Sequence, residues 1–472
     1  MGQEITQGRF STEDFLCFGE RLERETRLLE SWLLEGCFER GHHLGGVELE
    51  AWLVDGEAAP APLNQACIER IGDPLVVPEL ARFNLELNSQ PRALCGGVLS
   101  HLADELAATW NKCDLLAREQ GARMAMIGIL PTVTQADLCL DNMSPLRRYH
   151  ALDEQLFKLR GGEAVELDIV GRERLRLRHP DVMLEAATTS LQIHLRVNPD
   201  QVVRYYNASK ILAAPLVALS ANSPYLFGCD LWDETRVPLF EQAVAVGGDA
   251  LTRRVTFGVR YLRRSVMELF QANLDRYPVL LPRLLGQADG RLAHLCLHNG
   301  TIWRWNRPLV GFSDQGVPHL RIEHRVLPAG PSLEDCVANA ALYFGLVFSL
   351  ANAPEPPETQ LPHIAAAGNF YRAARHGLAA RVTWLDGCSG ALGRLCAERL
   401  LPMAMAGLVS MGVDPAEAAH WLGIVRERLR RRQTGALWQR RWVARHGRDM
   451  RGLTLAYLER QERGGPVHQW GV

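Results

Sequence analysis

The feature that most constrains the fold is a short apolar stretch, residues 45–55, which reads GGVELEAWLVD. Its β-favouring residues, between a glycine pair and Asp55-Gly56, predict a strand, and alternation along a strand places Glu48 and Glu50 on one face. Two carboxylates on one sheet face repel each other, so they require a cation, a shared proton or bulk water. The stretch is therefore either a solvated sheet surface or one side of a metal site.

A second segment, residues 76–89, has the same character. Asn84, Glu86 and Asn88 alternate with apolar residues, which predicts a half-buried strand with one acid between two amides on its polar face. Glu79 lies at the entry to this strand, seven residues before Glu86. A ligand-facing strand and an ordinary surface strand both remain possible from this pattern alone.

Two strands predicted further along the chain carry charged residues at the same two-residue spacing. Their polar faces carry Gln192, His194 and Arg196 in the first strand, and Arg321, Glu323 and Arg325 in the second. A lone histidine in a strand is usually structural, and alternating Arg and Glu can be a paired surface ladder. The alternative is a metal ligand in each strand, with arginines beside it that bind phosphate.

Residues 292–307 read LAHLCLHNGTIWRWNR, in which His298-Asn299-Gly300-Thr301 is either a turn or part of a glycine-kinked strand. Arg304 and Arg307 follow it. Arginine forms bidentate contacts with phosphate oxygens, so an arginine-rich strand next to acids suits nucleotide phosphates. An ordinary surface position for both arginines is the alternative.

Capping boxes and helical spacing of apolar residues predict the helical parts of the chain. Long helices are expected over residues 11–36, 97–120, 199–221 and 332–350, a short one over 64–71, and a buried strand over 123–130. From Arg372 onward the pattern predicts helix throughout, which divides the chain into residues 1–371 and a helical C-terminal region, 372–472.

The overall charge excludes some classes of function. Lys and Arg total 52 against 54 Asp and Glu, so no global field favours nucleic acid or a membrane surface. The basic stretch 426–451 is therefore expected to be a solvated helical face or a subunit contact, and a homo-oligomer is possible.

The cysteine pattern and the termini indicate the compartment. Eleven cysteines without a CxxC pair favour a reducing compartment over a disulfide framework or a zinc ribbon. No signal-like segment and no run of about 18 apolar residues occur, so we expect a soluble cytoplasmic protein.

Together the polar-faced strands predict one sheet that presents a shared metal site. Hard carboxylate oxygens with one imidazole suit Mg²⁺ or Mn²⁺. More acids are present than one ion needs, which favours two or three ions bridging the phosphates of ATP. The chain has no GxxxxGK[ST] motif, so a P-loop enzyme is not expected. The predicted metal-site residues are Glu48, Glu50, Glu79, Glu86, His194 and Glu323.

These residues, in this order, resemble the glutamate-cysteine ligase family, in its carboxylate-amine ligase branch. The resemblance rests on the GxExE stretch, the paired acids Glu79 and Glu86, the Gln-x-His strand, HNGTIWRWNRP and, most specifically, RIEHRVLPAGPS at 321–332 with LSANSP at 219–224. It covers about residues 45–350 in scattered blocks.

The resemblance implies an α+β fold like that of glutamine synthetase: a curved, mostly antiparallel sheet that forms a funnel covered by helices. It also implies ATP as a substrate and Mg²⁺ as a cofactor. Glu48, Glu50, Glu86, His194 and Glu323 match metal ligands of the family, Glu79 matches a further one, and Arg325 matches the arginine that steadies the transferred phosphoryl group. Arg304, Arg307 and Asn299 are assigned to the nucleotide or the substrate carboxylate.

The activity implied is ATP-dependent formation of an amide bond between glutamate, or a related carboxylate, and an amine acceptor such as cysteine. Glu48 and Arg325 are expected to act in catalysis. No cysteine-binding signature is readable, so the acceptor stays open. Two other functions are compatible with the same residues: a non-catalytic nucleotide or metabolite sensor, and a phosphotransferase that acts on a guanidino or amine group.

Overall fold

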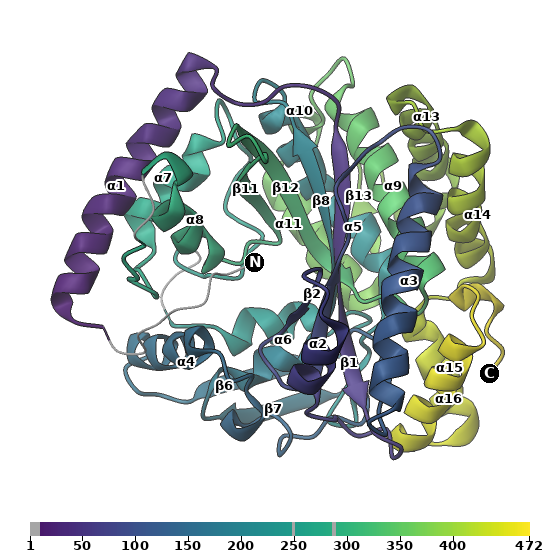
Figure 1. Cartoon of the computed structure of the whole chain (residues 1–472). Helices are drawn as coiled ribbons and strands as arrows, with labels where there is room; N and C mark the ends of the chain where they lie inside the picture. Colours follow the sequence, from purple (N-terminus) through teal and green to yellow (C-terminus); the bar gives the residue numbers. More distant parts are fainter. Residues whose placement is uncertain (1–9, 248–250, 286–288) are drawn as a thin grey trace.

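An eight-stranded curled sheet forms the centre of the computed structural model (Figure 1), which describes residues 10–247, 251–285 and 289–472. Every strand pairing in it is antiparallel, which confirms the expected α+β architecture. In spatial order its main strands are β11 (Asn306–Phe312), β12 (Pro318–Pro328), β8 (Ser190–Val197), β1 (Leu44–Val54), β3 (Asn84–Asn88) and β2 (Val76–Pro78). The short strands β4 (Arg92–Ala93) and β5 (Arg123–Ala125) also pair with β1.

The stretch from which the sequence analysis began is β1, the strand with the most neighbours in the sheet. Its glycine pair lies inside the strand. At Gly45 a Cβ atom would lie 2.6 Å from a Leu94 methyl carbon and 2.7 Å from the Phe344 ring, so only glycine allows the helical layer to pack this closely. One face of β1 is thus fixed against apolar side chains, and its acids occupy the other face.

Helices cover the apolar face of the sheet (Figure 1). Helices α3 (Val98–Arg118), α5 (Val202–Ser220) and α9 (Leu333–Ala351) contact its strands. Helices α11 (His363–His376), α13 (Leu401–Met411) and α14 (Pro415–Arg431) pack behind them, on α5 and α9. Helix α9 begins at the predicted cap, Ser332, whose side chain accepts a hydrogen bond from Asp335 N. Among the described residues, only α9 is long and apolar enough to span a membrane by length and composition, and most of it is buried inside the protein.

A second group of helices, at the left of Figure 1, stands opposite the polar face. It comprises α1 (Thr12–Glu35), α7 (Met267–Arg276) and α8 (Ala293–Gly300). Helix α1 begins with the capping box that the sequence predicts, formed by Ser11 and Asp14. It packs on α7 and α8, and the ion pair between Glu25 and His294, 2.6 Å apart and fully buried, joins α1 to α8.

The lower part of Figure 1 contains the region 137–178, for which no element was predicted. It forms α4 (Arg147–Leu159) and the hairpin of β6 (Val165–Val170) and β7 (Arg174–His179). Smaller elements complete the fold: α2 (Asn64–Ile71), β9 (Tyr225–Leu226), β10 (Cys229–Asp230), α6 (Arg236–Ala243), α10 (Pro357–Gln360) and α12 (Leu392–Leu395).

Three expectations about local structure are wrong. Residues 298–301, expected as a turn or a glycine-kinked strand, are the end of helix α8 and its C-cap Thr301, since apolar residues recur before them at helical spacing. The region after Arg372 is not helical throughout, because β13 (Arg381–Thr383) and β14 (Ser389–Ala391) form a hairpin around the turn at Asp386-Gly387. Only Arg123–Ala125 of the predicted strand 123–130 pairs in the sheet.

The C-terminal helices, α14, α15 (Gly435–His446) and α16 (Met450–Glu462), are joined to the rest of the protein by buried polar contacts. Arg428 forms an ion pair of 2.6 Å with Asp335 of α9, and both side chains are almost fully buried. Asn222 donates a hydrogen bond of 2.8 Å to the Tyr457 hydroxyl and accepts one of 3.1 Å from Gln439 Nε2.

These contacts concern the predicted division of the chain into residues 1–371 and 372–472. The boundary predicted at 371/372 falls inside α11, and α13 and α14 both pack on α9. Part of the basic stretch 426–451 is therefore core rather than solvated surface.

Candidate active site

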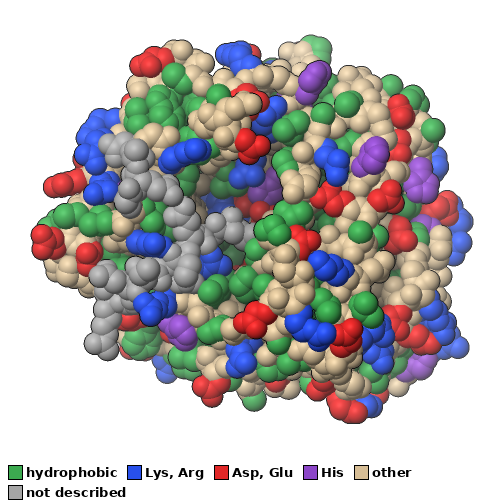
Figure 2. Space-filling model, in the orientation of Figure 1, with side chains coloured by type: hydrophobic (Ala, Val, Ile, Leu, Met, Phe, Trp, Pro, Cys, Tyr) green, Lys and Arg blue, Asp and Glu red, His purple; other side chains and the backbone are tan. Residues whose placement is uncertain are grey.

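Strand register brings the acidic side chains together on the polar face of the sheet. Glu50 of β1 lies directly opposite Glu86 of β3. On the other side of β1, His194 of β8 lies opposite Glu323 of β12, and Glu323 lies opposite Arg307 of β11. Like charges opposite each other destabilise a sheet, so the pairing of Glu50 with Glu86 needs a compensating cation or a bound proton. Figure 2 shows a hollow in this face of the molecule where acidic, basic and histidine side chains are visible.

The first cluster consists of Glu48, His194 and Glu323, whose ligand atoms all lie within 4.8 Å of one another. His194 Nε2 lies 3.1 Å from Glu48 Oε1 and 3.9 Å from Glu323 Oε1. Neither ring nitrogen has a hydrogen-bond partner among the described residues, although His194 is buried. A buried imidazole directed at two carboxylates without a hydrogen bond is the arrangement expected around a shared metal ion.

Two arginines next to Glu323 favour the ionised form of its carboxylate. Arg307 Nε and Nη2 donate to the two Glu323 oxygens at 2.7 and 2.8 Å, and Arg325 Nη1 lies 3.2 Å from Glu323 Oε2. Burial alone would raise the pKa of Glu323, but Arg307 and Arg325 lower it below the usual range. Burial also opposes ionisation of Glu48, whose pKa is lowered chiefly by His194. Both carboxylates are therefore ionised at neutral pH.

The second cluster consists of Glu50, Glu79 and Glu86, again within 4.8 Å of one another. Burial and then repulsion by Glu79 raise the pKa of Glu50 to about 7. Burial and the neighbouring acids raise the pKa of Glu86 well above its usual value, and the pKa of Glu79 is also raised by burial. Ser190 N and Gln192 Nε2 donate to Glu50 at 2.6 and 2.8 Å, which fixes the orientation of its carboxylate.

Glu185, in the 3₁₀ segment Val182–Ala187, is a site residue that the sequence analysis missed. Burial and then repulsion by Glu79 and Glu50 raise its pKa to about 8, so it adds a further acid beside the second cluster. The only signal in the sequence is an isolated acid in the apolar run VMLEAA just before the Gln-x-His strand. Because 3₁₀ geometry has neither strand nor α-helical periodicity, that signal could not place it.

The predicted site residues fall into two groups. The five acids and His194 come together as expected, with Arg307 and Arg325 beside them. Arg304 instead lies in a separate pocket with Lys210 and Tyr277. Both ends of the Asn299 amide are used within the protein, because Nδ2 donates to Pro308 O and Oδ1 accepts from Asn273 Nδ2, each at 2.9 Å.

The residues present fit divalent cations. In each cluster three ligand atoms lie close enough to share one ion, and the second cluster has no arginine in direct contact among the described residues. Oxygen ligands with one imidazole are the donor set that Mg²⁺ and Mn²⁺ accept. The two clusters occupy adjacent strands, so two ions would lie on the same face of the sheet.

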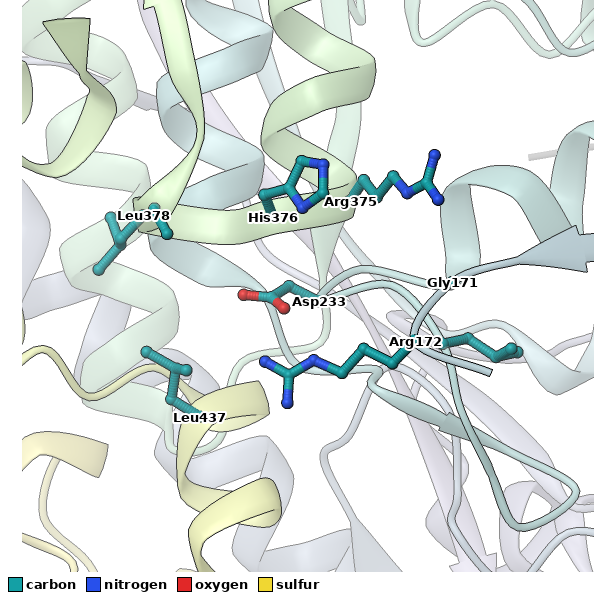
Figure 3. Close-up of a pocket in the computed structure, with 9 residues that line it drawn as sticks. Gly171, Arg172, Asp233, Arg375, His376, Leu378 and Leu437 are labelled. Atoms are coloured by element: carbon teal, nitrogen blue, oxygen red, sulfur yellow. The ribbon is translucent and has the colours of Figure 1, made fainter. Parts of the chain in front are cut away.

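A cavity of about 230 Å³ lies elsewhere, between the turn that joins β6 to β7, the end of α11 and α15 (Figure 3). It is lined by Arg172, Asp233, Arg375 and His376 together with apolar residues, and by none of the acids described above. Asp233 is already paired with Arg440. This cavity therefore does not extend the acidic site.

The comparison of the sequence with known families identifies the protein class. The chain matches glutamate-cysteine ligase family 2 (GCS2) over residues 44–451, which is most of its length. The chain belongs to this family. It is accordingly an ATP-dependent carbon–nitrogen ligase of the carboxylate–amine type, and the resemblance stated from the motifs is confirmed. The matched range contains every acid of the two clusters. A search of curated proteins finds no match.

Solved structures support the fold of this glutamate-cysteine ligase family member. The glutamate–cysteine ligase of Francisella tularensis, solved in complex with AMP, has a TM-score of 0.55 and 13% identity, with 92% of this chain and 89% of that chain covered. The bifunctional glutathione synthetase of Pasteurella multocida has the same TM-score and identity, with 92% of this chain and 54% of that chain covered. At this identity the similarity concerns the fold.

Proposed function

We propose that this protein uses ATP and Mg²⁺ to activate the γ-carboxylate of glutamate as an acyl phosphate and joins it to the amine of cysteine or of another amino compound. The observation that carries the proposal is the pair of adjacent acidic clusters, with Arg307 and Arg325 at one end. The AMP bound to the Francisella ligase supports an adenine nucleotide as substrate. Mn²⁺ is an alternative to Mg²⁺.

The proposed reaction has two steps. In the first, a carboxylate oxygen of glutamate bonds to the γ-phosphorus of ATP as the bond between that phosphorus and ADP breaks. In the second, the amine bonds to the acyl carbon as phosphate leaves, and the amine loses a proton. Divalent ions held by the two clusters would supply charge neutralisation for the phosphates. Glu48 and Glu323, both ionised at neutral pH, would hold one ion together with His194.

The arginines have a defined place in this scheme. Arg325 donates to the Gln192 side chain and lies beside Glu323, which holds its guanidinium at the polar face of the sheet. A guanidinium fixed in this way can bind an oxygen of the transferred phosphoryl group without reorganising. Arg307, held bidentately by Glu323, positions that carboxylate.

The test of the proposed function is a screen for ADP release with ATP, Mg²⁺ and paired amino acids, followed by the mass of the product. We expect release that requires both a carboxylate donor and an amine acceptor, and a product whose mass equals that of the two substrates minus water. Phosphorylated acceptor instead of free phosphate would indicate a phosphotransferase. ATP binding without turnover across the panel would indicate a sensor, and either result contradicts the proposal.

Metal binding can be tested without turnover. Adding Mg²⁺ to chelator-treated protein is expected to raise the unfolding temperature, because an ion relieves the repulsion among Glu50, Glu79 and Glu86. The measurement is thermal unfolding over a Mg²⁺ titration, with K⁺ at equal ionic strength as the control. Glu86→Gln should raise the unfolding temperature of the metal-free protein and reduce the gain from Mg²⁺. An equal gain in both proteins would show that this cluster binds no ion.

A further inference from the structure

A group of buried basic side chains lies outside the two acidic clusters, near the edge strand β11 of the sheet. It lines a small cavity between α5, the segment 256–262 and α7. Lys210 and Arg304 are its buried cations, with exposed fractions of 2% and 5%. Tyr206, Tyr261 and Tyr277 also line the cavity.

Lys210 has no carboxylate partner in the part of the chain that the structure describes. Its Nζ donates to the backbone oxygen of Phe257 and lies 4.8 Å from the Phe257 ring centroid and 5.7 Å from that of Tyr206. A Cβ atom at Gly258, where φ is +84°, would lie only 2.8 Å from Nζ, so the glycine makes room for the ammonium group. Burial, and then the charge of Arg304, lower the pKa of Lys210 to about 7.

The guanidinium of Arg304 has fewer of its hydrogen-bond donors paired than the ammonium group of Lys210. Its guanidinium lies over the Tyr277 ring, 5.4 Å from the centroid, while the buried Nη1 has no hydrogen-bond partner among the described residues. The buried Tyr261 hydroxyl likewise has none in that part of the chain. Buried polar groups are normally hydrogen-bonded, so two unpartnered groups that line one cavity indicate a missing partner that accepts hydrogen bonds.

Among the described residues, two acids lie near these groups without pairing with Lys210 or Arg304. Glu358 adds to the effect of burial in raising the pKa of Tyr261, but its Oε1 accepts a hydrogen bond from Asn207 Nδ2 and its Oε2 has no partner in the described ranges. Glu268 lines the cavity, but its carboxylate accepts hydrogen bonds from the backbone nitrogens of residues 263–265 and pairs with Arg260. Neither Lys210 nor Arg304 forms an ion pair with a described residue. Two buried cations without an anion among the described residues carry a large desolvation cost, which a bound anion would offset.

The sheet separates this cavity from the acidic clusters. Tyr206 donates to Asn306 O at 3.0 Å, and the Asn306 side chain bonds to His324, whose ring stacks on Tyr343 of α9. These side chains lie on the helix-covered face. Arg307, the next residue after Asn306, points to the opposite face and binds Glu323. A ligand at Lys210 would thus be on the other side of β11 from the metal centre.

We infer that Lys210 and Arg304 form a second ligand site, which binds the oxyanion head group, phosphate or carboxylate, of a small molecule. The cavity volume of about 50 Å³ exceeds the roughly 10–15 Å³ that a single water needs, and admits such a head group but not a nucleotide. An oxygen of the anion would accept hydrogen bonds from Arg304 Nη1 and the Tyr261 hydroxyl beside the Lys210 ammonium. The site is independent of the ligase reaction.

The test compares inorganic phosphate with acetate, at equal ionic strength and with chloride as the reference, on the full chain without nucleotide. Binding is measured by thermal unfolding and by titration calorimetry. The key variant is Lys210→Met, which keeps the length of the side chain and removes its charge. Lys158→Met, at an exposed position on α4, is the matched control. Tyr261→Phe removes one hydroxyl from the same cavity.

We expect phosphate, acetate or both to raise the unfolding temperature of the unmodified protein and of Lys158→Met. Affinity should fall about tenfold or more in Lys210→Met, and by less in Tyr261→Phe. The anion that binds identifies the head group. Equal affinity in Lys210→Met and the unmodified protein would overturn the proposal, since binding would then occur elsewhere, for example at Arg307 and Arg325. Absence of binding by both anions would also overturn it.

Discussion

Replacing Glu323 with glutamine is expected to lower the turnover number of the ligase reaction at least about 100-fold. Glu323 contacts more of the site than any other acid described above, since His194, Arg307 and Arg325 all lie within 4 Å of its oxygens. Glutamine keeps the shape but removes a charged metal ligand. It also ends the ion pairs that orient both arginines, so the metal and the phosphoryl-binding guanidinium are lost together.

The measurement is the turnover number at saturating ATP and Mg²⁺, together with the Mg²⁺ concentration that gives half-maximal rate. A loss through the metal should raise that Mg²⁺ concentration. Glu166→Gln, at an exposed position on β6, is the matched control and should leave both quantities unchanged. If Glu323→Gln retains the full rate with the same Mg²⁺ dependence, β12 does not hold a catalytic metal.

Replacing Arg428 with methionine is expected to reduce the free energy of unfolding by about 3–5 kcal/mol, because it leaves the Asp335 charge buried without its partner. The guanidinium donates to Asp335 Oδ1 and to Asn339 Oδ1, both at 2.6 Å, and to Leu219 O at 3.0 Å. It therefore connects α14 to both α9 and α5. The measurement is the urea concentration at the unfolding midpoint.

Two controls separate the loss of the ion pair from a general effect of the substitution. Arg430→Met changes an exposed arginine of the same helix and should alter the free energy of unfolding by about 0.5 kcal/mol or less. Adding Asp335→Asn to Arg428→Met should cost less than the sum of the two single changes, because the stranded charge is removed. Strict additivity would show that the pair does not couple these helices.

The strands of the site could be predicted from the sequence because their alternation has a period of two and their boundaries are marked. Glu48, Glu50, Glu86, His194 and Glu323 were placed on the correct strands and on one face by that rule alone. Pairing these strands required more than local pattern. Their order in the sheet, with β8 and β12 on one side of β1 and β3 on the other, depends on pairings between segments far apart in the sequence.

The site residues that were assigned wrongly or missed depend on structure that the local sequence pattern does not determine. Arg304 and Arg307 are assigned together on charge and position, but they are three residues apart, a spacing that places two side chains on opposite faces of a strand. Asn299 is assigned to the nucleotide or the substrate carboxylate, whereas both ends of its amide are used within the protein, by Pro308 O and Asn273 Nδ2. The environments of Glu185 and Lys210 are set by residues distant in the sequence. Local periodicity does not identify those residues.

The buried contacts of the C-terminal helices also impose an order on biosynthesis. Asn222 and Asp335 emerge from the ribosome long before their partners Tyr457 and Arg428, since 235 and 93 residues separate the two pairs. At usual translation rates Asn222 remains without Tyr457 for on the order of ten seconds or more. The central sheet can assemble during this interval, but its helical layer cannot close. The buried contacts of Asn222 and Asp335 therefore form only after α16 and α14 have been synthesised.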